Sequence, residues 1–114
     1  MVFQTYSKNI LVTESLQEYL AMKLHHVDRL SVRPIACRVD VSRDQHHKKG
    51  NVFRIEINLN VPGALLRVVE KHQDVRAAIG FASDKLLRQL KKFKSKKIDT
   101  KRRLARFIKR STRQ

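Results

Sequence analysis

The sequence predicts a single α+β domain with the element order β-α-β-β-β-α, in which two helices pack on one face of a four-stranded, mostly antiparallel sheet. Apolar residues recur every three or four positions in two segments, which is typical of amphipathic helices. In the segments between them they recur every second position, which is typical of strands with one buried face. A length of 114 residues suits one compact domain.

The first strand and the first helix are predicted from the N-terminal third of the chain. Residues 2–6 mix aromatic and β-branched side chains, which favours a short strand. Thr13 is the expected N-cap of a helix over residues 14–30, and Pro34 lies beyond the end of that helix. The apolar face of this helix consists of Leu16, Leu20, Leu24, Val27 and Leu30.

Three strands are expected in the middle of the chain. Alternation predicts a strand over residues 35–42, and the polar stretch 43–50 is expected to be a loop. The clearest alternation covers residues 53–61. The Pro-Gly pair at 62–63 predicts a tight turn, because proline presets its φ angle and glycine tolerates positive φ. A last strand over residues 64–70 completes a hairpin.

The second helix is expected to begin after the candidate N-cap Asp74 and to end near residue 96. Gly80 within it costs of order 1 kcal/mol relative to alanine and suggests a close approach to the sheet. Residues 97–114 contain too few apolar side chains to extend the core. The sequence therefore predicts a domain over 1–96 and a basic C-terminal tail over 97–114 that is disordered when free. The apolar face of the second helix consists of Val75, Ile79, Ala82, Leu86, Leu90 and Phe93.

The charge of the chain is unevenly distributed. The formal net charge is +16, from 26 basic and 10 acidic residues, and residues 84–114 carry 14 of the basic side chains with only Asp84 and Asp99 as acids. Such an excess favours a polyanionic partner, and nucleic acid is the first expectation. With one cysteine, no long apolar run and no signal peptide, the sequence predicts a cytoplasmic protein with no membrane partner.

Basic residues on the two helices are the candidates for RNA binding. Lys85, Arg88 and Lys92 have the spacing of one helix face, and like charges so placed repel each other by a few tenths of a kcal/mol per pair. The alternative is a solvated helix face without a ligand. If the helices lie side by side, their polar faces are expected to line one positive groove that follows a phosphate backbone. The candidates are Lys23, Arg29, Lys85, Arg88, Lys91 and Lys92.

Base stacking by aromatic side chains is not expected. Phe53, Phe81 and Phe93 fall on apolar periodic faces, where a place in the core is predicted. Recognition of a nucleic acid should therefore depend on its phosphates and its shape and not on the identity of its bases.

The sequence predicts neither a metal site nor an enzyme. The pairs at 25–26 and 46–47 are adjacent histidines without further ligands at a suitable spacing, and Cys37 is expected to point into the core. No nucleophile motif or glycine-rich phosphate loop is present, so no cofactor is expected. Asp40 and Glu56 are expected to be ordinary sheet residues.

Residues 71–79, followed by 84–92, resemble the second-helix signature of the ribosome hibernation promoting factor family, also described as ribosome-associated translation inhibitors or sigma-54 modulation proteins. Residues 7–13 are similar to the segment that leads into the first helix of that family. The resemblance covers about residues 2–96, and the element order matches the fold of the family.

The resemblance implies a non-enzymatic factor that binds the small ribosomal subunit near the decoding centre. Family members block the mRNA and tRNA sites, inhibit translation in stationary phase or stress, and in many cases promote ribosome dimers. It also implies a bacterial cytoplasmic protein, monomeric when free, with no small-molecule substrate. Lys71 is a weaker candidate than the others, and the residues expected to contact ribosomal RNA phosphates are Lys23, Arg29, Lys85, Arg88 and Lys92.

Three departures from the family pattern concern the helix entry and the tail. Arg76 occupies a position where a tyrosine is common. The sequence is expected to be a short form, without the separate C-terminal dimerisation domain of the long members, and its tail is basic where some short members have an acidic one. Arg102, Arg103 and Arg106 of the tail are further candidates for RNA contacts. A general double-stranded RNA binder and a protein that regulates a transcription factor remain as alternatives.

Overall fold

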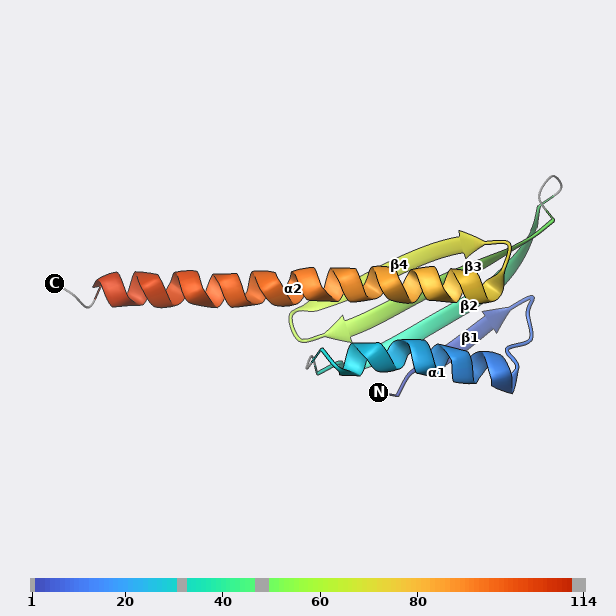
Figure 1. Cartoon of the computed structure of the whole chain (residues 1–114), viewed down its shortest axis with the longest axis horizontal. Helices are drawn as coiled ribbons and strands as arrows, with labels where there is room; N and C mark the ends of the chain where they lie inside the picture. The colour runs from blue at the N-terminus through green and yellow to red at the C-terminus, as the bar shows by residue number, and fades with distance from the viewer. Residues whose placement is uncertain (1, 31–32, 47–49, 112–114) are drawn as a thin grey trace.

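The computed structural model describes residues 2–30, 33–46 and 50–111, which form four strands and two helices (Figure 1). In chain order the elements are β1 (Gln4–Lys8), α1 (Glu14–Asp28), β2 (Ala36–His46), β3 (Gly50–Val61), β4 (Ala64–His72) and α2 (Val75–Ser111).

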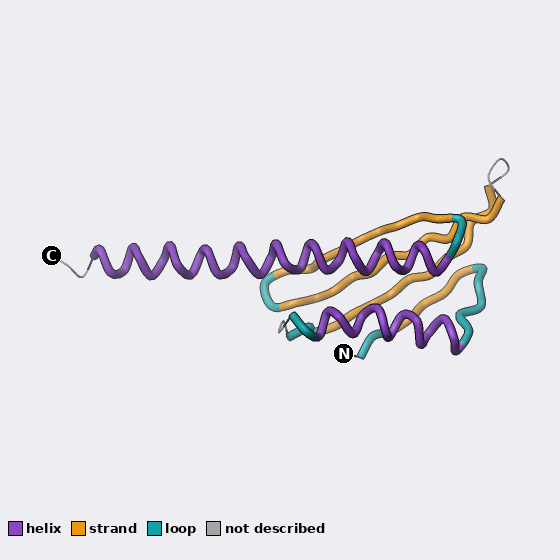
Figure 2. The backbone as a smooth tube through the Cα atoms, in the orientation of Figure 1, coloured by secondary structure: helices purple, strands orange, loops and turns teal. Residues whose placement is uncertain are grey.

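The four strands form one sheet in the order β1-β2-β3-β4. β1 pairs with β2 in parallel through the crossover helix α1, and the other two pairs are antiparallel. The register places Val39, Ile57 and Val68 in one row across the three longer strands. Both helices lie on the same face of this sheet (Figure 2), so the predicted fold class is confirmed.

The core lies between that face of the sheet and the two helices. The side chains of Leu20 and Leu24 from α1 and of Leu86 and Leu90 from α2 are at most 1% exposed. Burial of each such side chain contributes about 1.5–3 kcal/mol to folding. Cys37 is buried among them, as expected, and its burial raises the pKa of its thiol to about 11.

The predicted helix starts and the predicted turn are confirmed. The Thr13 hydroxyl accepts a hydrogen bond from the backbone N–H of Leu16 at 3.2 Å, which satisfies one of the unpaired donors at the start of α1. The Asp74 carboxylate accepts one from the backbone N–H of Arg76 at 3.1 Å at the start of α2. Gly63 has a φ angle of +89°, which a glycine adopts without strain.

The hairpin between β2 and β3 is longer than the sequence predicts. Residues 43–46, expected in a loop, pair in antiparallel register with residues 50–53. Ladder hydrogen bonds join backbone groups, so a hairpin can continue beyond the core without apolar side chains. Residues 47–49 of the expected loop lie outside the described residues.

α2 continues as a helix past residue 96, where the sequence predicted its end, and reaches Ser111. Beyond Lys94 every side chain through residue 109 is exposed, and this part of α2 projects past the sheet (Figure 1). The segment contains no glycine or proline and is rich in lysine and arginine, so its residues favour a helix without packing. Disorder of this segment in the free protein stays a prediction.

Two expectations about individual residues of α2 are wrong. Phe81 is 53% exposed and lies outside the core, whereas Phe53 and Phe93 are half-buried. Gly80 faces α1 and not the sheet, because a Cβ atom there would lie 3.8 Å from the hydroxyl oxygen of Tyr19. This is an ordinary contact distance, so no close approach requires the glycine.

Candidate nucleic-acid interface

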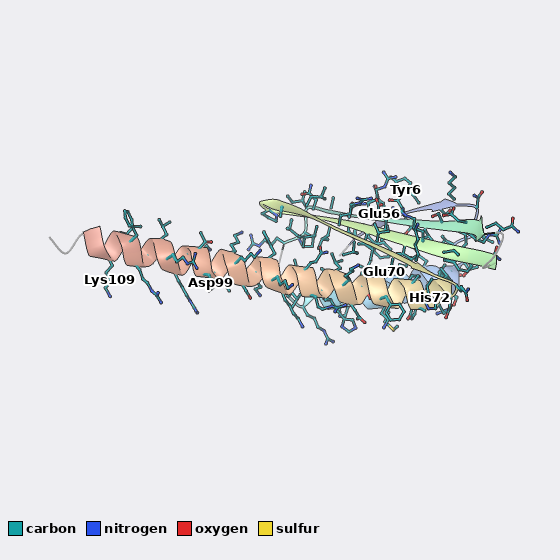
Figure 3. All side chains as sticks on the ribbon, turned by 90° about the horizontal axis from the view of Figure 1, so that it is seen from above. Tyr6, Glu56, Glu70, His72, Asp99 and Lys109 are labelled. Carbon is teal, nitrogen blue, oxygen red and sulfur yellow. The ribbon has the colours of Figure 1, made fainter. Side chains whose placement is uncertain are left out.

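A row of exposed basic side chains follows the side of α2 that lies over β4. It consists of Lys85, Arg88 and Lys92, which we call the α2 stripe. The ammonium nitrogen of Lys85 lies 3.1 Å from a carboxylate oxygen of Glu70 on β4, which fixes this side of the helix against the sheet edge. Figure 3 shows Glu70 beside α2. The ion pair offsets one of the three positive charges in the stripe.

An exposed aromatic pair lies one helical turn before the stripe. The rings of Phe81 and His72 are 5.7 Å apart and tilted by 49°. The His72 ring is held in place, because its Nδ1 accepts a hydrogen bond from the backbone N–H of Asp74 at 2.9 Å. The sequence analysis did not predict that Phe81 is exposed. Lys85 and Arg88 follow it by four and seven residues, and this spacing could have placed Phe81 on the exposed basic face.

The opposite side of α2 faces α1. The guanidinium of Arg76 donates to the Ser15 hydroxyl at 2.8 Å, and its central carbon lies 4.9 Å from the centre of the Tyr19 ring. Lys23 approaches the same ring at 5.6 Å. Arg76, which departs from the family pattern, therefore joins the two helices.

The basic candidates do not form one groove between the helices, as the sequence analysis expected. Lys91 lies three turns after Gly80, which faces Tyr19, so Lys91 belongs to the α1 side of α2, together with Lys23. The α2 stripe lies on the other side, over β4. The helices thus present two separate basic surfaces, because the apolar face of α2 lies between its two basic flanks.

Two further candidates are remote from the stripe. Arg29 is exposed at the C-terminal end of α1. Lys71 is exposed near the end of β4, and because Glu70 and His72 on either side of it face α2, its side chain points to the opposite face of the sheet. Neither joins the α2 stripe.

Charges on the open face of the sheet are largely paired within that face. Glu56 accepts hydrogen bonds from Arg54 at 2.8 Å, from Arg67 at 2.9 Å and from Asn58 at 3.0 Å. These bonds, first that from Arg67, lower the pKa of Glu56 from 4.5 to about 2. Figure 3 shows Glu56 and Tyr6 on the side of the sheet away from α2.

A second ion pair on this face lies next to the first. Arg38 donates to both carboxylate oxygens of Asp40 at 3.1 Å, and its guanidinium lies 3.9 Å from the centre of the Tyr6 ring. Asp40 and Glu56 are partners in the strand register. Each carboxylate is held by arginine, which fits their expected role as sheet residues.

The projecting part of α2, residues 95–111, is called the α2 extension. Arg102, Arg103 and Arg106 are exposed on it. Asp99 and Lys109, labelled in Figure 3, mark its course away from the sheet. Exposed apolar side chains also lie on the extension, including Ile98 and Leu104 at 43% and 58% exposure.

Lys94 is a structural residue that the sequence analysis did not identify. Its ammonium donates to the backbone carbonyl of Leu30 at 2.7 Å, just after the end of α1. A cation there stabilises the carbonyl groups that a helix leaves unpaired at its C-terminus. Its partner lies 64 residues away in the sequence, so helical spacing gives no signal of this contact.

In the described part of the chain, no group of three or more histidine, cysteine, aspartate or glutamate side chains is placed to hold a metal ion. The side chain of His46 lies outside the described residues. Within residues 2–30, 33–46 and 50–111, no helix is both long and apolar enough to cross a membrane.

Comparison with protein families gives a match over residues 3–98 to the family described as "Sigma 54 modulation protein / S30EA ribosomal protein". The ribosome hibernation promotion factor of Deinococcus radiodurans is 41% identical over 95 residues, which are 83% of this chain and 50% of that protein. The factor of Picosynechococcus is 33% identical over 99 residues, 82% of this chain and 49% of that protein. This chain thus spans about half the length of these two relatives.

A shorter relative and two solved structures are also similar. The ribosome hibernation promoting factor of Azotobacter vinelandii is 34% identical over 88 residues, 77% of this chain and 78% of that protein. The N-terminal domain of Thermus thermophilus Protein Y matches with a TM-score of 0.69 and 31% identity, over 81% of this chain and 97% of that domain. A ribosomal subunit interface protein from Coxiella burnetii shares the fold, with a TM-score of 0.68 and 18% identity, over 83% of this chain and 99% of that chain.

Proposed function

Because the chain belongs to the Sigma 54 modulation protein / S30EA ribosomal protein family, we propose that it is a ribosome hibernation factor. In this proposal it binds the small ribosomal subunit near the decoding centre, occupies the mRNA and tRNA sites, and inhibits translation under stress or in stationary phase. It acts by steric exclusion and not by catalysis, as a cytoplasmic protein that is monomeric when free. The names of the relatives, all hibernation factors, support this role.

The observation that carries the proposal is the contrast between two charged surfaces of the molecule. On the open sheet face, Glu56 and Asp40 are each paired with arginine. Along α2, Asp84 and Asp99 are the only acids after residue 83, and the basic side chains of the stripe and of the extension through residue 109 are exposed. The positive charges on such a surface repel each other in the free protein, and the phosphates of RNA relieve this repulsion.

The two basic parts of α2 have different roles in this proposal. The α2 stripe lies on a helix face that the core holds in place, so its charges are preorganised for one docking orientation. The α2 extension, with Arg102, Arg103 and Arg106, projects beyond the sheet and adds phosphate contacts further along the RNA. Lys23, Lys91, Arg29 and Lys71 widen the contact with ribosomal RNA.

Sedimentation with purified ribosomes tests the proposal. The protein is mixed with ribosomes or with separated small and large subunits and run on sucrose gradients. We expect it to sediment with the small subunit. The bound fraction should fall as the salt concentration rises. An excess of a long RNA duplex is the control competitor, since a general double-stranded RNA binder would leave the subunit for it. The position of the ribosomes in the same gradients shows whether dimers form. Sedimentation at the top of the gradient at low salt would contradict the proposal.

A further inference from the structure

A hollow of about 320 Å³ lies at the point where α2 leaves the sheet. Three segments distant in the sequence meet there: Arg33 before β2, Pro62 in the turn between β3 and β4, and the part of α2 from Phe93 to Lys101. The volume is within the range of small-ligand sites. None of the residues discussed above as the α2 stripe belongs to it.

Four cationic side chains converge on the hollow, namely Arg33, Lys94, Lys97 and Lys101. None of the described residues that line it is acidic. The hydrogen bond of Lys94 to the carbonyl of Leu30 holds one of these cations in place before any ligand arrives. Like charges gathered around one hollow repel each other, so the arrangement favours an anion as its occupant.

The remaining lining of the hollow is apolar. It comprises Phe93, which is half-buried, Pro62, and Ile98, which is 43% exposed. One face of α2 supplies both kinds of side chain, because the i, i+3, i+4, i+7 spacing is that of Lys94, Lys97, Ile98 and Lys101. The cations and the apolar side chains therefore line the same hollow. A ligand that combines negative charge with an apolar surface matches this lining.

We infer that this hollow binds one nucleotide of a single-stranded RNA segment, with its phosphate on Lys97 and Lys101 and its base against the apolar side chains. Nucleobases pack on aromatic and apolar side chains beside cations that hold the backbone. Further along the α2 extension, exposed arginines continue the positive surface for the neighbouring phosphates. This inference deepens the proposed function and rests on it for the source of the RNA.

Two double variants with equal loss of charge test the inference. Lys97→Gln with Lys101→Gln removes two cations from the hollow. Lys96→Gln with Arg103→Gln removes two exposed cations from the other side of the same helix. Binding of a short single-stranded RNA oligonucleotide to the free full-length protein is measured at fixed salt. We expect the first variant to bind at least tenfold more weakly than the second, because it loses a defined contact and not only net charge.

An Ile98→Ala variant tests whether the base packs against the apolar side chains of the hollow. It should weaken oligonucleotide binding severalfold without changing the slope of log affinity against log salt, since no phosphate contact is lost. Amide chemical shifts on titration with the oligonucleotide should change over residues 93–101. Leu104→Ala, which removes an exposed apolar side chain of the extension outside the hollow, is the control and should bind as the wild type.

An equal loss of oligonucleotide affinity in the two double variants would overturn the inference. It would show that binding depends on net charge and not on the hollow. Poly-glutamate is the second probe: if it binds with the same difference between the variants, the hollow is a site for acidic protein and the inference is also wrong. The assay uses no ribosomes, so its result is separate from the sedimentation test. A protein that binds the oligonucleotide through the hollow but not the small subunit would overturn the proposed function alone.

Discussion

The environment of Glu56 depends on the register of two strands. Arg54 and Asn58 lie two residues away on β3, whereas Arg67 lies on β4, and the three together lower the pKa of Glu56 to about 2. Alternation predicts that Glu56 is on the open face of the sheet. It does not predict which arginine of the next strand lies within reach, because that depends on the register of the hairpin.

The stability of the domain should fall in acid because of Glu56. Its pKa is lower in the folded protein than its ordinary value of 4.5, so its ionised form stabilises the fold above that pH, and this contribution is lost as the pH falls from about 4.5 to about 2. Glu56→Gln should lower the free energy of unfolding at neutral pH by about 1 kcal/mol and flatten this acid dependence. Urea unfolding at several pH values measures both effects.

Glu18→Gln, at an exposed position of α1, is the matched control for that experiment. It removes one carboxylate and keeps the three hydrogen bonds of Glu56, so it is the reference against which the acid profile of Glu56→Gln is compared. If Glu56→Gln kept the acid profile of the wild type, the role given to the three hydrogen bonds of Glu56 would be wrong.

Gly80→Ala should stabilise the protein. A methyl group at this position would lie 3.8 Å from the Tyr19 hydroxyl, which is ordinary contact, and alanine favours the helix over glycine by about 1 kcal/mol. The expected result is a gain of up to about 1 kcal/mol in the free energy of unfolding, measured by urea denaturation. A loss of stability would show that α1 and α2 approach more closely at Gly80 than the structure has them.

Phe81 shows where periodicity fails for a single residue. Three residues near it in the sequence, Ala78, Ala82 and Ser83, are all buried. Phe81 lies one position from Ala82, about 100° around the helix, and is 53% exposed, so it lies at the margin of the buried face. Spacing alone did not separate the centre of the apolar face from its margin, so the sequence analysis placed Phe81 in the core.

At the scale of elements, the alternating and helical patterns predicted every strand and helix, and the errors lie at the ends. The ends of β2 and β3 and the last part of α2 are held by backbone hydrogen bonds beyond the core. Hydrophobic periodicity reports burial, and therefore it stops where burial stops. The predicted end of the second helix near residue 96 coincides with the point at which α2 leaves the sheet.

Deletion of residues 97–114 tests the separation between the domain and the extension. The described side chains of this segment through residue 109 are exposed, so the truncated protein should keep its thermal stability within a few degrees. Binding to the small subunit should weaken, with a shallower dependence of log affinity on log salt, because fewer phosphates are neutralised. Differential scanning calorimetry and sedimentation at several salt concentrations measure the two effects. A large drop in melting temperature would instead show that the extension stabilises the domain.

At the scale of the whole molecule, the sequence predicted the fold class and the order of the elements but not the arrangement of charge around α2. Periodicity shows which face of a helix is buried. It does not show which neighbour lies on each flank, because that depends on the order of the strands and on the position of α1. The ion pair of Lys85 with Glu70 and the contact of Arg76 with Tyr19 settle this point and separate the two basic surfaces.

The central claim is that the α2 stripe docks the protein on the small ribosomal subunit, and a matched pair of triple variants tests it most directly. Lys85→Gln, Arg88→Glu and Lys92→Glu alter the stripe, with glutamine at position 85 so that no new acid faces Glu70. Arg102→Gln, Arg103→Glu and Arg106→Glu change the net charge by the same amount on the α2 extension.

Affinity for purified small subunits is measured for both triple variants and the wild type at one salt concentration, after circular dichroism has shown equal folding. The account predicts that the stripe variant loses binding, because it lacks the preorganised contacts, while the extension variant still binds, only more weakly. Equal binding by the two variants, or stronger binding by the stripe variant, would contradict it.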